Sequence, residues 1–230
     1  MLLALDTATS TASVALYHLE SHQLLGELTW QARRRQTQDL MPALQDLLRL
    51  LGSAAQEVTA LAVTTGPGSF TGVRIAVSAA KGLALGLERP PAVVGIPTLS
   101  VTAAPFLELA AAHVGVRICA AIQAGRGRYN WAWFASHDLL QRPTGEEHHA
   151  GTVAEFVAHL AEHNSAVWLA GELGADLHAA VADMPHVRSV DAITSLRRAG
   201  QLARLAALHL AAGHNDAIES LQPLYLRNPA

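Results

Sequence analysis

Cysteine and lysine are nearly absent from this sequence of 230 residues, and charged side chains are scarce. Cys119 is the single cysteine, so no disulfide can form within the chain, and we expect a cytoplasmic protein. The net charge is −3, and Arg33-Arg34-Arg35 is the sole run of three basic residues. A run this short usually belongs to a solvated surface, so nucleic-acid binding by this chain unaided is not expected.

Long hydrophobic segments are also missing. No stretch of about eighteen residues is uniformly apolar, so no membrane span is predicted. No basic segment precedes the apolar residues at the start, so no signal peptide is predicted either. Half of the residues are nevertheless apolar, which is ample for a sizeable core, and the length fits one large or two small domains.

The stretch from Val58 to Leu87 organises the rest of the chain. Its first residues, 58–64, are apolar and β-branched and predict a buried strand. Thr65–Ser69 then predicts a glycine-rich turn, and a helix begins at Thr71 with Ser69 or Thr71 as N-cap. Such a turn can present free N–H groups to an anion. It can equally be a tight connection that binds nothing.

The nucleotide-binding motifs that this turn could match are absent. No lysine follows Gly72, so the Walker A pattern fails, and Gly66, Gly68 and Gly72 are spaced too widely for a dinucleotide fingerprint. The helix over 71–87 is apolar on nearly all sides, which predicts burial in a core or against another chain. The helix over 38–51 adds a continuous leucine stripe and ends at Gly52. Together they offer more apolar surface than one side of a small sheet needs.

Alternating apolar runs and helical periods outline the remaining elements. Strands are predicted over 2–5, 12–17, 24–30, 92–95, 116–122, 129–135, 166–170 and 187–190. Further helices are predicted from residue 97 or 98 towards 113, over 153–163, after the turn 171–174 to about 182, and over 194–212. We place an N-terminal lobe at 1–105 and a C-terminal α/β lobe at 106–230, with a tail that can pack back on the first lobe.

The strand order resembles the ribonuclease-H-like half of the actin/Hsp70/sugar-kinase ATPase fold, an α/β fold of two lobes with mixed sheets. In that fold an aspartate after the first strand holds metal-bound water, and hydroxyls of the next turn approach phosphate. The turn after the first strand resembles the first of these phosphate loops, and the residues identified as phosphate-loop-like, there and in the glycine-rich turn, are Asp6, Thr7, Ser10, Gly66, Gly68, Ser69, Thr71 and Gly72. The competing interpretation is that Asp6 accepts hydrogen bonds from its own turn.

Four segments resemble the bacterial TsaB (YeaZ) family, which acts in threonylcarbamoyladenosine biosynthesis. They read LDTATSTASVALY (5–17), TTGPGSFTGVRIAVSAAKGLALG (64–86), VVGIPTL (93–99) and PLYLRN (223–228). The resemblance covers roughly the first 135 residues and the C-terminus, and GPGSFTGVR is a specific signature. It implies the actin/Hsp70-like fold.

The resemblance also implies a role. Members have no catalytic residues of their own and bind no cofactor alone; their paralogue TsaD holds a metal and ATP or ADP and transfers threonylcarbamoyl to the adenosine 3′ of the tRNA anticodon. TsaE joins through the complex, and a member alone forms homodimers. Both pairings use the helices that correspond to 38–51 and 71–87. The interface residues expected here are Leu40, Met41, Leu44, Leu47, Leu48, Val73, Arg74, Val77 and Lys81.

Two departures from the family stand out. Gln36-Thr37 replaces a common His-Thr or His-Ser pair before the first helix. Gln123 and Gly125 stand where the family often has an aspartate and an arginine. Any polar contact at these positions is therefore made differently in this chain.

Two other function classes stay open. His159 and His163 form an H-x-x-E-H pattern with Glu162, which occurs in zinc peptidases, but no third ligand is marked. An active small-molecule kinase or ATPase would need a second Asp-x-Gly turn, and 166–174 contains no aspartate. Residues 146–149, Glu-Glu-His-His, are expected in an exposed loop.

Overall fold

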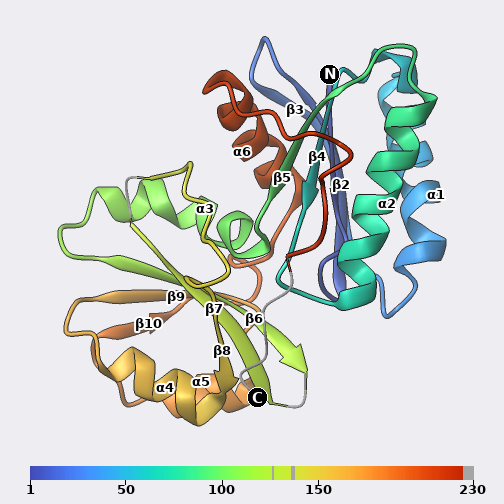
Figure 1. The fold of residues 1–230 in the computed structure, drawn as a ribbon. Coiled ribbons are helices and arrows are strands. Elements are labelled where there is room, and N and C mark those ends of the chain that lie inside the picture. Colours follow the sequence, from blue (N-terminus) through green and yellow to red (C-terminus); the bar gives the residue numbers. More distant parts are fainter. Residues whose placement is uncertain (126, 136–137, 225–230) are drawn as a thin grey trace. The chain divides into compact units, whose positions relative to one another are not determined.

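The computed structural model describes residues 1–125, 127–135 and 138–224, which form two compact units (Figure 1). The first unit holds Met1–Thr98 and Arg198–Leu224, and the second holds Leu99–Arg197. The expected division at residue 105 differs from this, because the last helix and the segment after it belong to the first unit. Arg126 and the Tyr225–Asn228 part of the C-terminal motif lie outside the described residues.

The first unit is built on a five-stranded mixed sheet of order β3-β2-β1-β4-β5. Its strands are β1 (Leu2–Asp6), β2 (Thr11–His18), β3 (Gln23–Gln31), β4 (Ala60–Thr64) and β5 (Ala92–Ile96). Short turns join β1, β2 and β3, so these strands run antiparallel. Helical crossovers lead to β4 and β5, which therefore run parallel to β1.

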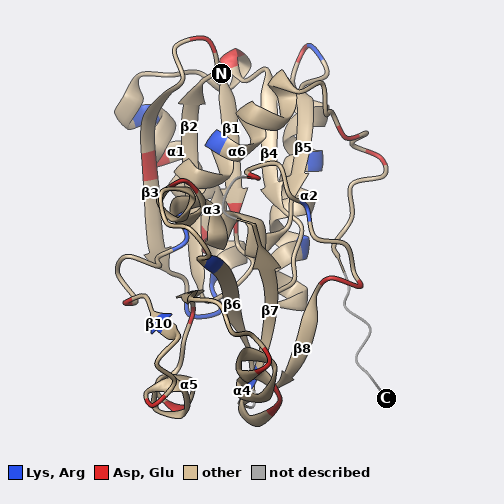
Figure 2. Ribbon diagram, turned by 90° about the vertical axis from the view of Figure 1, so that its left-hand side faces the viewer, with Lys and Arg blue, Asp and Glu red and all other residues tan. Residues whose placement is uncertain are grey.

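Three helices cover the two faces of this sheet. The helices α1 (Gln36–Leu51) and α2 (Phe70–Gly86) pack on one face, and α6 (Ala199–Ala211) packs on the other (Figure 1). A short 3₁₀ turn, η1 (Ala55–Glu57), leads into β4. Figure 2 shows α6 lying across the strands of this sheet, and few charged residues are seen on α6 and on the strands beneath it. Both faces of the sheet are thus buried, which explains the almost uniformly apolar strands β1 and β4.

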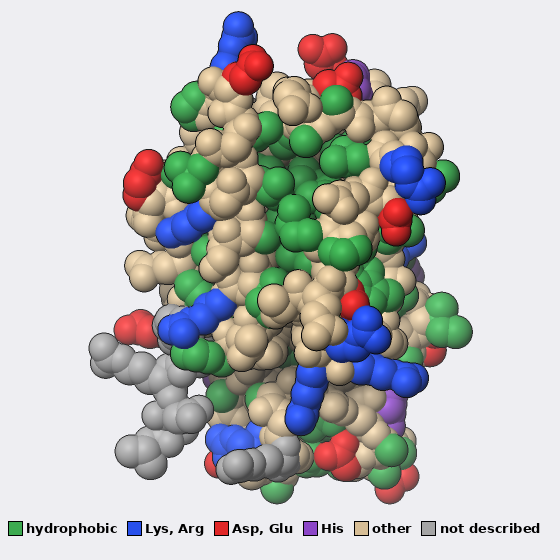
Figure 3. Space-filling model, turned by 90° about the vertical axis from the view of Figure 1, so that its right-hand side faces the viewer, with side chains coloured by type: hydrophobic (Ala, Val, Ile, Leu, Met, Phe, Trp, Pro, Cys, Tyr) green, Lys and Arg blue, Asp and Glu red, His purple; other side chains and the backbone are tan. Residues whose placement is uncertain are grey.

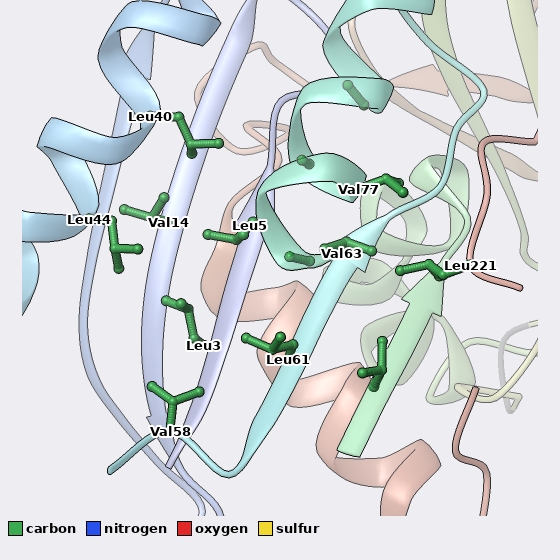
Figure 4. Close-up of a cluster of buried hydrophobic side chains, with 14 of the residues drawn as sticks. Leu3, Leu5, Val14, Leu40, Leu44, Val58, Leu61, Val63, Val77 and Leu221 are labelled. Atoms are coloured by element: carbon green, nitrogen blue, oxygen red, sulfur yellow. The ribbon is translucent and has the colours of Figure 1, made fainter. Parts of the chain in front are cut away.

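The main core of the first unit lies between the sheet and the pair α1–α2. Leu40 and Leu44 of α1 point at Val14 of β2, and Val77 of α2 lies over Val63 of β4 (Figure 4). The ends of these helices follow the sequence signals. Ser69 caps α2 by accepting the Gly72 N–H at 3.2 Å, and Gly52 ends α1 with φ 62°, so both predictions are confirmed.

The segment after α6 runs along the outer edge of β5. The Val93 N–H donates to Asn215 Oδ1 and the Gly95 N–H donates to Asp216 Oδ2, both at 2.8 Å. Leu221 adds an apolar side chain to the core of the first unit. The segment therefore satisfies groups of an edge strand that would otherwise be open to pairing with another chain.

The second unit has a five-stranded mixed sheet of order β10-β9-β6-β7-β8. Its elements are α3 (Thr98–Ala111), β6 (Arg117–Gly125), β7 (Arg128–Phe134), β8 (His149–Thr152), α4 (Val153–Ala161), β9 (Val167–Gly171), α5 (Ala175–Val181) and β10 (Val187–Ser189). Residues of β6 alternate between two cores: Ile118 and Ile122 belong to the cluster that includes α3, whereas Cys119 belongs to the cluster that includes α4 and α5. Two α/β units with mixed sheets confirm the predicted fold class.

Three details of the second half differ from expectation. Strand β8 begins at His149, inside the expected exposed loop, and His148 is buried. Helix α6 begins at Ala199 rather than at residue 194, because Ser13 Oγ and Glu27 Oε2 accept the N–H groups of Ala199 and Gly200 there.

Among the residues that the structure describes, no helix combines the length and the apolarity needed to cross a bilayer.

Candidate functional site

The two loops that resemble phosphate loops pack directly against each other. The Thr7 hydroxyl donates to Gly72 O and the Ser69 N–H donates to Ala8 O, both at 2.6 Å. A Cβ at Gly72 would lie 2.1 Å from Thr7 O, and one at Gly68 would lie 2.3 Å from Ala8 O. Both glycines are therefore required by the close approach of two backbones.

Asp6 lies at the end of β1, as predicted, and its carboxylate serves the turn. Asp6 Oδ1 accepts the Ala8 N–H and the Thr64 hydroxyl, each at 2.9 Å. In the second loop Gly66 has φ 105°, and its carbonyl accepts the Thr98 N–H at 2.7 Å. Four of the eight predicted loop residues are exposed, namely Ser10, Gly68, Ser69 and Thr71. Asp6 thus accepts a hydrogen bond from its own turn, as in the competing interpretation, and a contact with phosphate stays a prediction.

Five of the nine predicted interface residues lie in the core of the first unit, which corrects that part of the prediction. Their side chains are 5% exposed or less: Leu40, Leu44, Leu47, Val73 and Val77. The leucine stripe of α1 and the valines of α2 face the sheet, because that face needs one apolar side of each helix. Leu48 is half-buried, and Lys81, also half-buried, donates to Glu219 O at 3.2 Å.

The other predicted interface residues, Met41 and Arg74, lie on the outer side of the two helices. Met41 is 40% exposed, and Phe70, at the start of α2, is 58% exposed. The Arg74 guanidinium stacks over the Phe70 ring at 3.8 Å from its centroid. Arg74 and Ser78 follow Phe70 along an exposed side of α2, so the core of the unit covers only the other side of this helix.

A groove of about 480 Å³ runs between these outer faces. Its lining comes from both helices: Thr37, Leu40, Met41, Phe70, Thr71, Arg74, Ile75, Ser78 and Ala79. Figure 3 looks onto this side and shows hydrophobic side chains gathered along it, with basic side chains towards its lower end. Exposed large apolar side chains in a groove with a polar rim are typical of a protein-binding surface. Small residues such as Ser78 and Ala79 leave room for another helix to approach closely.

Most of the residues that line this groove were not predicted as interface residues from the sequence. Six of the nine lining residues were not among the predicted interface residues: Thr37, Phe70, Thr71, Ile75, Ser78 and Ala79. A usable signal existed in the helical period, because residues opposite the Leu40–Leu44–Leu47 stripe must face away from the sheet.

Gln36, the first position at which this chain departs from the family pattern, is buried, and its side chain makes a hydrogen bond within the protein. Its side-chain amide donates to Thr9 O at 3.0 Å, within the loop that follows Asp6. A glutamine here thus fixes the position of that loop relative to the start of α1. The side chain of Thr37, in contrast, lines the groove.

The second departure, Gln123, is part of a polar network in the second unit. The Gln123 side chain hydrogen bonds to the Tyr129 hydroxyl, which donates to Asp176 Oδ1 at 2.8 Å and accepts the Gly174 N–H at 2.9 Å. Burial raises the pKa of Tyr129, and its hydrogen bond keeps the pKa of Asp176 below the usual range. An acid is therefore present beside β6, but it comes from α5.

The two histidines of the H-x-x-E-H pattern lie among aromatic rings. His159 Nδ1 accepts the Trp131 Nε1–H at 2.8 Å, and His163 Nδ1 lies 3.4 Å from the Arg117 guanidinium. Burial is the main cause that lowers the pKa of His163 and of the neighbouring His149. Over 1–125, 127–135 and 138–224, no three His, Cys, Asp or Glu side chains converge as metal ligands.

The place of a second phosphate loop, after β9, is occupied by a structural ion pair. Gly171 has φ 123°, and a Cβ there would lie 2.0 Å from Ala121 O. Glu172 follows and pairs with Arg197 at 3.3 Å, and the arginine side chain is only 2% exposed. The acid after β9 therefore holds a buried arginine.

A second cavity, of about 520 Å³, lies between the hairpin β2–β3 and α6 in the first unit. Its acid is already engaged, since Glu27 pairs with Arg198 at 3.3 Å and accepts the Gly200 N–H at 3.0 Å. This cavity therefore offers no unpaired acid, and the groove between α1 and α2 is the stronger candidate site.

Comparison with known proteins identifies the family. Residues 28–149 match the family model of TsaD, tRNA N6-adenosine threonylcarbamoyltransferase. The tRNA threonylcarbamoyladenosine biosynthesis protein TsaB of Escherichia coli (strain K12) is 34% identical over 227 residues, which cover 99% of this chain and 94% of the relative. The tRNA N6-adenosine threonylcarbamoyltransferase of Symbiobacterium thermophilum is 37% identical over 59 residues, 26% of this chain and 17% of that protein.

A solved structure agrees with the sequence relatives. YeaZ from Pseudomonas aeruginosa is similar with a TM-score of 0.74 and 29% identity, and the match covers 98% of this chain and 99% of that one. Since the identity to the E. coli protein extends over nearly the whole length of both sequences, this chain belongs to the TsaB family.

Proposed function

We propose that this chain acts in tRNA threonylcarbamoyladenosine biosynthesis in the cytoplasm, as the non-catalytic partner of a TsaD-class transferase. The names of its TsaB relatives support the pathway. The observation that carries the partner role is the groove between α1 and α2, whose large apolar side chains Met41 and Phe70 are exposed. An exposed apolar groove on a chain with so little surface charge favours a protein partner over a small polar substrate.

A TsaD-class protein is the occupant that fits this groove. The TsaD family model matches residues 28–149, a segment that includes both α1 and α2. A TsaD-class protein therefore carries counterparts of the two helices. Two helix pairs of the same kind can pack face to face as a four-helix bundle, which would cover the exposed sides of both.

The same argument covers the remaining associations. In the absence of the transferase, a second copy of this chain offers an identical helix pair, so we propose a homodimer through the same groove. TsaE joins through the complex, and ATP or ADP and the metal belong to the transferase. The packing of the two phosphate-loop-like turns supports this last point, because the N–H groups of Ala8, Ser69 and Gly72 already donate within the protein.

Reconstitution tests the proposal. The purified chain is mixed with the TsaD and TsaE proteins of the same organism, threonylcarbamoyl-adenylate and unmodified tRNA, and the modified nucleoside is measured by mass spectrometry. We expect modification only when this chain is present, and no ATP turnover by the chain alone on the order of 1 per second. Full modification without the chain would contradict the proposal, and so would ATPase or kinase activity of the chain alone that is lost in Asp6→Asn.

A further inference from the structure

The turn before α1 has an unusual backbone. The Arg35 N–H donates to Ala32 O at 2.7 Å, and the two residues between them, Arg33 and Arg34, have φ 43° and 70°. A four-residue turn with this hydrogen bond and positive φ at both central positions is a type I′ turn. We call residues Ala32–Arg35 the arginine turn.

Arginine is a poor choice for these two positions. Type I′ turns favour Asn-Gly, because a Cβ with a long side chain clashes with the backbone at positive φ. Positive φ in bulky residues is uncommon, and where it persists it often marks a functional position. The sequence therefore keeps two large cationic residues where the fold alone would favour small ones.

The turn is held firmly in this conformation from both sides. The buried Ala32 donates its N–H to Ser10 O at 2.8 Å, and the buried Gln36 donates to Thr9 O at 3.0 Å. The strained backbone is thus fixed to the loop after Asp6. A fixed turn presents its two central side chains at a defined place.

The side chains of Arg33 and Arg34 make no contribution to the fold that would offset this conformation. Both residues are exposed, and within the described ranges neither takes part in a hydrogen bond, an ion pair or a cation–π contact. Arg35, next to them, pairs with Asp39 at 3.2 Å. The two arginines at the tip are therefore two uncompensated positive charges on a chain of net charge −3.

We propose that Arg33 and Arg34 bind backbone phosphates of the tRNA substrate. This inference rests on the proposed function, which brings a polyanion to the complex. A guanidinium is always charged and binds a phosphate through two parallel hydrogen bonds. Phosphate contacts are made by exposed basic side chains without apolar burial, whereas the core of a protein interface is poor in charge. Gln31, which precedes the turn, and Arg35, its last residue, are both exposed and polar, so the surroundings of Arg33 and Arg34 resemble a phosphate-binding surface more than the core of a protein interface.

The test uses a double variant, Arg33→Asn with Arg34→Gly. It supplies the residue pair that the turn favours and removes both charges, so loss of folding is not expected. The tRNA affinity of the complex with the TsaD-class partner is measured by fluorescence anisotropy at several salt concentrations. Loss of two phosphate contacts should lower the slope of log K against log salt by about 1.5, since each contact contributes about 0.7–0.9.

Two matched variants separate position from charge. Arg89→Gln with Arg188→Gln removes the same net charge from exposed positions outside the turn and should leave the salt slope unchanged. Arg33→Lys with Arg34→Lys keeps the charge and should retain most of the slope. A slope that falls equally in the Arg89/Arg188 variant would show a general charge effect and would overturn the assignment.

The remaining outcomes are distinct. The wild-type complex is measured first, and its failure to assemble or to bind tRNA would contradict the proposed function itself. A normal wild-type complex with an unchanged salt slope in the Asn-Gly variant would overturn the arginine assignment alone. Loss of partner binding by that variant in the absence of tRNA would also overturn it, because the arginines would then bind protein.

Discussion

Each of the two helices that form the groove is preceded by a turn with unusual residues. Packing explains these residues in one of the turns and not in the other. In the glycine-rich turn before α2, every special position has a structural cause: Gly68 and Gly72 admit the carbonyl groups of Ala8 and Thr7. In the arginine turn before α1, the positive φ angles of Arg33 and Arg34 have no such cause in packing.

The roles that the structure indicates for these two turns are the opposite of those that their sequences suggest. The glycine motif looks like an anion site, yet its donors are engaged and its glycines hold two backbones together. The arginine run looks like an ordinary solvated surface, yet Arg33 and Arg34 have positive φ angles that the packing of the fold does not require. A glycine motif is thus informative about function only after its N–H groups have been traced to their acceptors.

Substituting Gly72 tests the structural side of the comparison and has the largest expected effect. Gly72→Ala would place a Cβ 2.1 Å from Thr7 O, so we expect a loss of at least about 3 kcal/mol in the free energy of unfolding. The control is Gly82→Ala in the same helix, where a Cβ meets nothing within 4 Å and should stabilise by about 0.5–1 kcal/mol. Urea denaturation measures both. Equal effects would contradict a packing role for Gly72.

Asp6 provides a second test of the same turn. Asp6→Ala leaves the buried Ala8 N–H and Thr64 hydroxyl without this acceptor, so we expect a loss of about 2–3 kcal/mol. Asp6→Asn keeps an oxygen at the same place and should cost less than half as much. If both variants are as stable as the wild type in thermal unfolding, Asp6 is not needed for the fold, and a role in phosphate chemistry regains support.

The arginine turn should respond in the opposite direction. Replacing Arg33 by Asn and Arg34 by Gly relieves two unfavourable φ angles, and we expect a net stabilisation of about 1 kcal/mol, which raises Tm by about 2–4 °C. Differential scanning calorimetry measures this shift. A lower Tm would mean that the two side chains stabilise the fold, and the contrast between the turns would be lost.

The smallest expected effect is that of pH on the stability gain of the Asn-Gly variant, compared with its effect on the stability of the whole protein. Burial lowers the pKa of His149 and His163 in the second unit, so the folded state favours their neutral forms. This stabilisation is complete above the unfolded pKa of about 6.5 and is lost as the pH falls through the lower folded values. Overall stability should therefore decline from pH 7 to 5. The Tm gain of the Asn-Gly variant should stay constant, because arginine does not titrate; a gain that changes with pH would implicate a neighbouring titratable group.

Local signals in the sequence were enough for much of the fold. The apolar strands, the N-cap Ser69 and the terminal Gly52 each depend on neighbouring residues only, and the structure has all of them. Helix α6 is harder, because its first turn is fixed by Ser13 and Glu27, which are distant in sequence. Burial of His148 is likewise set by tertiary packing, which no local pattern reports.

The candidate site could be predicted only in part. The helices were the expected ones, but an apolar stripe does not state whether its partner is a sheet or another chain. Leu44 and Val77 therefore appeared as interface residues although they belong to the core. The arginine turn was unpredictable for a different reason, since residue types favour a conformation on average and Arg33 and Arg34 adopt one that arginine disfavours.

The proposed function depends above all on binding of the transferase to the outer face of α1 and α2. Isothermal titration of the TsaD-class partner into Met41→Glu and Gln45→Glu tests it directly, because both variants add one charge to exposed positions of α1 and only Met41 lines the groove. Burying an unpaired carboxylate costs several kcal/mol. We expect at least about a 100-fold loss of affinity for Met41→Glu, about 2.7 kcal/mol, and little change for Gln45→Glu. Wild-type affinity for a folded Met41→Glu variant would contradict the claim.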